Sequence, residues 1–183
     1  YEWDNPKDLT PLSASKLVLD EVRAQAPDAR LFIYEGWADM AGVIRGFPPN
    51  SRRLARYHRF NTDAYHEWYV GYTQALAQAY PQARVQLIPV ASALGKVLAD
   101  RALRDLTATD LYTDDAPHGT PTLYFLASLV TYAVLYDTAP PAALVLPSSV
   151  HPVVRANYGV IAQQIAQITG TKRAALNSDA AAP

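Results

Sequence analysis

The chain has 183 residues and no cysteine, and its 16 Lys and Arg side chains nearly balance 17 Asp and Glu side chains, leaving a net charge of −1. Without cysteine, a disulfide framework, a thiolate nucleophile and a cysteine-ligated zinc site are excluded. A nearly neutral chain has no overall charge that favours nucleic acid or an anionic membrane surface as a partner. Half of the residues are hydrophobic, so the chain is able to bury one sizeable core.

Membrane spans, targeting signals and metal sites are not indicated. No apolar run approaches the roughly 18 uninterrupted residues that a span requires, so we expect none. The first residues, YEWDNPKDLT, show neither a basic n-region nor an apolar h-region, so either a signal peptide has been removed or none existed. The four histidines lack metal-ligand spacing, and we expect no structural metal.

The N-terminal part of the chain predicts a helix, a short strand and a long loop. Thr10 followed by Pro11 is typical of a helix cap and a first helical position, and apolar residues then recur at helical spacing up to Pro27. Residues 31–35, LFIYE, predict a buried strand. Residues 36–61 contain Gly and Pro interruptions and no sustained period, which predicts a long loop with room for one helical turn.

The middle of the chain alternates again between helix and strand. Residues 62–80 carry aromatic and aliphatic side chains at spacings of three and four, which predicts a helix with an aromatic packing face that ends before Pro81. Residues 85–90, VQLIPV, predict a second short strand. Residues 91–103 predict a modest helix after it.

Two more helices are predicted toward the C-terminus. Thr120 and Pro121 repeat the cap-then-proline pattern ahead of the apolar stretch LYFLASLVTYAVLY. After a proline-broken connection, a last helix is predicted from residue 151 or 152 through residue 168, with Gly170 as its C′ residue. Residues 171–183 predict a flexible tail.

The order of these elements is typical of a parallel sheet with helices on both faces. Two parallel strands leave two open edges and cannot fill a layered α/β core by themselves. We therefore expect a flavodoxin-like three-layer α/β/α sandwich of which residues 1–183 form a single, partial domain. The other strands would lie in a segment N-terminal to this sequence or in a second chain.

The stretch TDDAPHGTP, residues 113–121, places carboxylates and an imidazole in a turn ahead of an apolar helix. In a serine hydrolase, a histidine accepts the hydroxyl proton and a carboxylate holds the imidazole in the required tautomer. Asp115 and His118 are the candidates for these two roles, and Asp114 competes with Asp115. The alternative is a surface pair or a helix cap, which is the more common role of such neighbours in a loop.

The sequence DAPHGTP, residues 115–121, resembles the last conserved block of the SGNH (GDSL-type) hydrolases, a family of esterases, lipases and carbohydrate deacetylases. The upstream segments LFIYEGWA and VQLIPV, with the helix between them, follow the order found in that family. The resemblance covers roughly residues 10–169 and implies that Asp115 orients the imidazole and His118 is the general base. The family's Gly-Asp-Ser block and its two oxyanion blocks are not found here, and Leu123 stands where the family often has glycine.

The resemblance implies hydrolysis of an acyl or acetyl ester, on a carbohydrate or small alcohol, through an acyl-serine whose serine lies outside this sequence. This chemistry needs no cofactor, and the same residues would serve acyl transfer to a sugar hydroxyl. The resemblance also implies a periplasmic or secreted location. The alternative, favoured by the missing nucleophile, is a non-catalytic relative that binds a glycan or a partner protein.

Residues after the first strand are candidates for substrate binding, because loops at the carboxyl ends of parallel strands line the ligand crevice. Arg45 and Arg52 are suited to hold a carboxylate, sulfate or phosphate group. Glu35 and Trp37 lie at the base of the same segment, and Trp37 would either stack on a sugar ring or pin the segment to the core. A solvated, mobile loop is the alternative reading of this segment.

Overall fold

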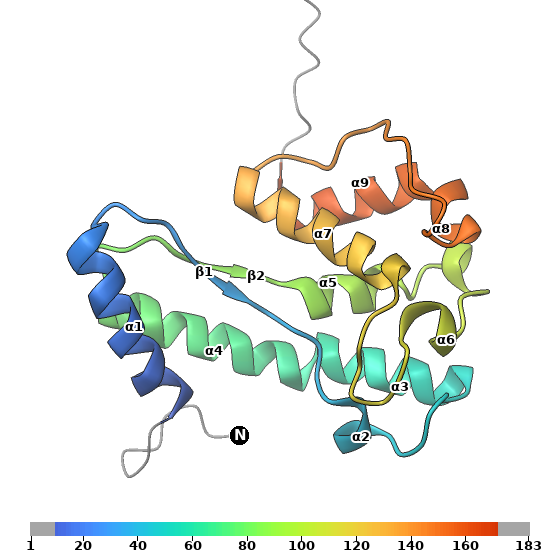
Figure 1. Ribbon diagram of the computed structural model, residues 1–183, viewed down its shortest axis with the longest axis horizontal. Helices are drawn as coiled ribbons and strands as arrows, with labels where there is room; N and C mark the ends of the chain where they lie inside the picture. The colour runs from blue at the N-terminus through green and yellow to red at the C-terminus, as the bar shows by residue number, and fades with distance from the viewer. Residues whose placement is uncertain (1–9, 172–183) are drawn as a thin grey trace, which may run out of the picture.

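The computed structural model describes residues 10–171, and within them two short strands pair in parallel (Figure 1). Strand β1 (Leu31–Tyr34) lies beside β2 (Val85–Ile88), with Leu31 opposite Val85 and Tyr34 opposite Ile88. The chain crosses from one strand to the other through helices α2 (Met40–Val43), α3 (Ser51–Thr62) and α4 (Ala64–Ala79). The expected mixed α/β character with parallel pairing is confirmed, and the third layer and further strands of a sandwich stay a prediction.

Helices lie on both faces of β2, and in this two-stranded sheet each described strand has one edge without a neighbouring strand. Helices α4 and α7 (Pro121–Tyr136) both contact β2, one below and one above the strands in Figure 1. Helix α1 (Pro11–Gln25) packs on α4. Within residues 10–171, β1 has a neighbouring strand on one side only, and its Tyr34 is 48% exposed. Parallel strands are normally covered on both faces and paired on both sides, so the free edges of this sheet, that of β1 included, are unusually open.

The main core lies between helices rather than around the sheet. Helix α5 (Val90–Val97) is at its centre and packs against α3, α7 and α9 (Tyr158–Thr169). Every residue of α5 except Lys96 is buried. A Cβ atom on Gly95 would lie 2.6 Å from the Thr62 methyl carbon and 3.0 Å from the His58 carbonyl oxygen, so the glycine permits the close approach of α3 and α5.

The second half of the segment 36–61 is not the predicted loop. Helix α3 begins where the Asn50 side chain accepts a hydrogen bond from the Arg53 main-chain N–H at 3.0 Å. Its buried residues are Leu54, Tyr57 and Asn61, whose spacing of three and four gives one inward face. The exposed arginines and the preceding prolines concealed this period, and only the part before Asn50 retains loops around the short helix α2.

Several other boundaries were predicted correctly. Thr10 and Thr120 cap α1 and α7 through their hydroxyl groups, and Gly170 ends α9 in the left-handed conformation with φ of 68°. The single last helix was wrong, because Asn157 separates α8 (Pro152–Ala156) from α9. The predicted tail lies outside the described residues after position 171.

The remaining elements are short. The predicted helix over 91–103 is divided into α5 and a 3₁₀ turn, η1 (Arg101–Leu103), and α6 (Ala108–Leu111) follows it. The predicted strand over 85–90 ends at Ile88, since Val90 already belongs to α5. No helix within residues 10–171 is both long and apolar enough to cross a membrane.

Replacing Gly95 by alanine tests the contact between α3 and α5. We expect Gly95→Ala to lower the free energy of unfolding by about 1–3 kcal/mol, because the added methyl group forces the two helices apart. Gly159→Ala is the matched control, since nothing lies within 4 Å of a Cβ there and alanine favours the helix. Urea unfolding followed by circular dichroism measures both; equal effects of the two substitutions would contradict the close contact.

Candidate active site

Residues 112–120 form a closed loop between α6 and α7. The Thr113 main-chain N–H donates to the His118 carbonyl oxygen at 2.8 Å, and that of Thr120 donates to the Leu111 carbonyl oxygen at 2.9 Å. Tyr112 and Gly119 thereby pair as an isolated antiparallel bridge. These bonds fix the shape of the loop that carries the candidate Asp and His residues.

His118 is held by the carboxylate of Asp114. Its Nδ1 atom lies 2.7 Å from Asp114 Oδ2, and its main-chain N–H donates to Asp114 Oδ1 at 3.1 Å. An ionised carboxylate only accepts hydrogen bonds, so the proton of the neutral imidazole is on Nδ1 and the lone pair is on Nε2. Among residues 10–171 nothing is hydrogen-bonded to Nε2, and the side chain is 69% exposed. This geometry leaves Nε2 ready to accept a proton from an incoming group.

The partner of His118 is Asp114, not the expected Asp115. Asp115 instead accepts a hydrogen bond from the Ala41 main-chain N–H through its own carbonyl oxygen, at 3.2 Å. This contact fixes the Asp115 backbone against α2, while Asp114 spans the turn and meets both the main chain and the ring of His118. The hydrogen bonds from the His118 side chain and main chain lower the pKa of the Asp114 carboxyl group.

Trp37 ties the loop to the segment that follows β1. Its Nε1–H donates to the Pro117 carbonyl oxygen at 2.6 Å, and its ring meets Tyr112 edge-on at 6.4 Å between centroids. Of the two roles predicted for Trp37, the structure shows the anchoring one. Gly119 is equally constrained, because a Cβ there would lie 3.1 Å from the ring of Tyr124, whose hydroxyl accepts the Gly119 N–H.

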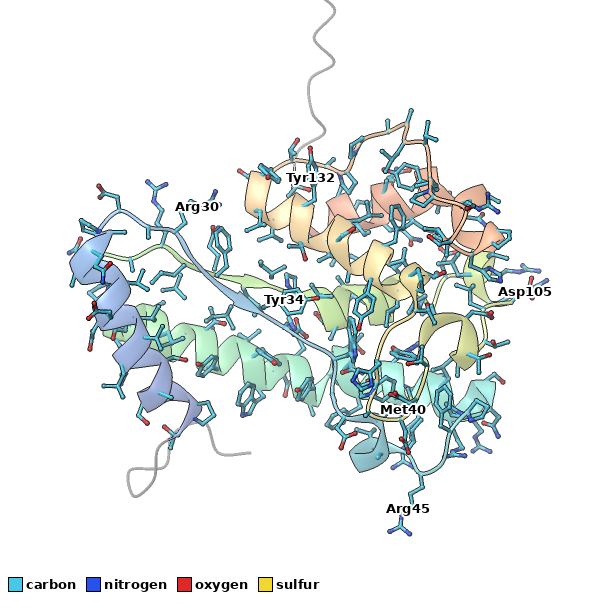
Figure 2. The ribbon with its side chains drawn as sticks, viewed as in Figure 1. Arg30, Tyr34, Met40, Arg45, Asp105 and Tyr132 are labelled. Carbon is cyan, nitrogen blue, oxygen red and sulfur yellow. The ribbon has the colours of Figure 1, made fainter. Side chains whose placement is uncertain are left out.

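The other predicted binding residues do not gather around His118. Arg45 and Arg52 are exposed, and Figure 2 shows Arg45 extending away from the body of the molecule. No hydrogen bond or ion pair joins either arginine to the 112–120 loop in the part of the chain that the structure describes. Glu35 is wholly buried, so its carboxylate is not placed to contact a substrate.

Glu35 instead joins β1 to two helices. Its Oε1 accepts the Ser92 main-chain N–H at 3.2 Å, and its Oε2 accepts the Ser92 hydroxyl at 3.0 Å and lies 3.1 Å from His66 Nδ1. Burial raises the pKa of the Glu35 carboxyl group, and the bonds from His66 and Ser92 oppose this. The carboxylate at the end of the strand was the only sequence signal for this cluster.

No described serine lies against His118. The Ser92 hydroxyl is bonded to Glu35, that of Ser128 to the Phe125 carbonyl oxygen, and that of Ser13 to the Thr10 carbonyl oxygen. Within the described residues no group of three or more His, Asp or Glu side chains is arranged to hold a metal ion. The loop therefore presents an imidazole oriented by a carboxylate, with no described serine hydrogen-bonded to it.

Comparison with protein-family models, with curated proteins and with solved structures finds no match for this chain. The resemblance to the SGNH hydrolases consequently rests on the residues of the 115–121 block and on the order of the elements around it.

Replacing His118 tests the pairing with Asp114. We expect His118→Ala to raise the Asp114 pKa toward the ordinary value of about 3.9, because the two hydrogen bonds that stabilise its carboxylate are weakened or lost. The pairing contributes to folding at pH values above the ordinary pKa and is lost as the pH falls through the folded value. Carboxyl ¹³C NMR titration measures this shift.

His151→Asn is the control, since His151 lies beside Asp110 and asparagine preserves a capping side chain at the start of α8. It should leave the titration of Asp114 unchanged. A shift at Asp115 in place of Asp114 in the His118 variant would contradict the assignment.

Proposed function

We propose that this chain supplies the histidine and carboxylate of a serine ester hydrolase, an acyl or acetyl esterase of SGNH type that acts on a carbohydrate or small-alcohol ester. The observation that carries the proposal is the 2.7 Å contact of His118 Nδ1 with Asp114, which leaves Nε2 exposed with its lone pair available. A surface ion pair alone would contribute little to stability, so it does not by itself explain the fixed loop around the pair.

The nucleophile would come from outside the described residues, on a strand paired with the free edge of β1. Trp37 and Ala41, which follow β1, contact Pro117 and Asp115 in the loop. The carboxyl end of β1 therefore lies beside the loop that carries His118. Neighbouring parallel strands end at the same edge of a sheet, where ligands bind in open α/β sheets. A serine just after an added parallel strand would thus approach His118 Nε2.

The proposed reaction follows the usual two steps of acyl transfer. Nε2 of His118 takes the serine proton as the hydroxyl oxygen attacks the ester carbonyl carbon, and Asp114 stabilises the imidazolium that forms. The imidazolium then returns the proton to the departing alcohol, leaving an acyl-serine. Water, or a sugar hydroxyl in an acyl transferase, is activated by the same nitrogen and releases the acyl group.

The second candidate is a non-catalytic domain that binds a glycan or a protein. It is favoured by the lack of any serine against His118 among residues 10–171 and by the exposure of the pair, 69% for His118 and 44% for Asp114. Labelling with a fluorophosphonate probe distinguishes the two, because the probe forms a covalent adduct only with an activated serine.

We expect the protein, isolated with its natural termini and any natural partner chain, to take up one fluorophosphonate and to hydrolyse 4-nitrophenyl acetate. His118→Ala should lower kcat/KM by about 10²–10⁴-fold, because the general base is lost. Asp114→Asn should lower it strongly as well, since the amide no longer fixes the Nδ1–H tautomer.

Asp115→Asn is the matched control and should retain most of the activity, because the Asp115 contact to α2 is made by its main chain. A greater loss of kcat/KM in Asp115→Asn than in Asp114→Asn would indicate that Asp115 orients the imidazole, as the resemblance to the family implies. Failure to bind the probe, or full activity in His118→Ala, would exclude the esterase and leave the binding domain.

A further inference from the structure

A groove between α3 and α5 lies outside the His118 loop and has no part in the proposed esterase. Its volume is about 470 Å³, within the usual range of small-molecule sites. Its apolar wall is formed by leucines of α3, α6 and the segment after α5, which are Leu54, Leu98, Leu103, Leu106 and Leu111. Four of these leucines, all but Leu98, are buried and form an apolar floor, and the groove is large enough for the body of a small organic ligand.

The charged residues that line this groove are mostly cationic. Arg59 of α3, Lys96 of α5 and Arg104 after η1 supply three positive charges, and Asp63 is the one carboxylate among the lining residues. Lys96 is the only exposed residue of an otherwise buried helix. Within residues 10–171 neither Arg59 nor Lys96 has an ion-pair partner, while Arg104 makes a loose, exposed contact of 3.8 Å with Asp105. Two of the three cations are thus available to an anion.

The inner wall of the groove is polar but uncharged near neutral pH. His58 lines it, and its Nε2 lies 3.3 Å from the Tyr112 hydroxyl. Burial lowers the pKa of His58 to about 4, so its imidazole is neutral at physiological pH. The groove consequently combines apolar leucines and a neutral imidazole with positive charge on exposed side chains.

We propose that the groove between α3 and α5 is a binding site for an amphipathic anion, an organic acid with an apolar body, whose carboxylate or phosphate group is held by Arg59 and Lys96. The apolar body lies against the leucines, where its removal from water favours binding. The acidic group stays near the exposed cations, which form charge-assisted hydrogen bonds with it. This inference is independent of the esterase proposal.

Octanoate is the probe, with 1-octanol as the uncharged ligand of the same chain length. We expect isothermal titration calorimetry to show saturable binding of octanoate and at least about tenfold weaker binding of octanol, because one charge-assisted contact is worth about that factor. The double replacement Arg59→Gln with Lys96→Gln should weaken octanoate binding by about tenfold or more and leave the affinity for octanol unchanged. Amide NMR shifts on octanoate addition should centre on Gly95 and its neighbours.

Two further variants separate the groove from general surface effects. Ala55→Phe, at an exposed position of α3 that lines the groove, should fill it and abolish octanoate binding while the circular dichroism spectrum stays unchanged. Arg45→Gln removes an exposed arginine remote from the groove and should have no effect. The proposal is overturned if octanoate does not saturate below about 10 mM, if octanol binds as tightly, or if Ala55→Phe binds normally.

Discussion

The end of β1 is fixed by one buried carboxylate, and the rest of the candidate site is built from that point. Glu35 meets Ser92 at the start of α5 and His66 on α4, so two helices that are distant in sequence share its two oxygen atoms. A wholly buried carboxylate is stable only when its oxygens are satisfied in this way. Any shift of α4 or α5 relative to the strand would leave Glu35 without partners, which makes their relative positions strongly specified.

The chain that leaves this fixed point carries the contacts that shape the His118 loop. The Ala38 main-chain N–H donates to Asn61 of α3 at 2.8 Å, and the Ala38 carbonyl oxygen accepts the Tyr57 hydroxyl. Trp37 and Ala41, on either side, bind the loop at Pro117 and Asp115. The orientation of the imidazole thus depends on the loop itself and on a segment about 80 residues earlier.

The sequence predicted those features that depend on local chemistry. Thr10 and Thr120 were recognised as caps because a hydroxyl before proline favours a helix start whatever surrounds it. Helix α3 was missed, since only three inward positions mark it among arginines. Asp115 was chosen over Asp114 because the family spacing selects it, whereas the hydrogen bonds of the folded turn pair His118 with Asp114. The partners of Glu35 could not be predicted from the neighbouring sequence either, because they come from two separate helices.

Helix α3 separates the two sites proposed for this chain. Tyr57 faces the candidate catalytic loop and packs edge-on against Tyr112 at 5.7 Å, whereas the next residue, His58, lines the groove. Consecutive residues of a helix point about 100° apart, so the two surfaces cannot coincide. Tyr112 contacts both residues: its ring packs against Tyr57, and its hydroxyl lies near His58 Nε2. A substitution such as Ala55→Phe therefore lies across this aromatic layer from Asp114 and His118, which allows binding in the groove and catalysis at the loop to be tested separately.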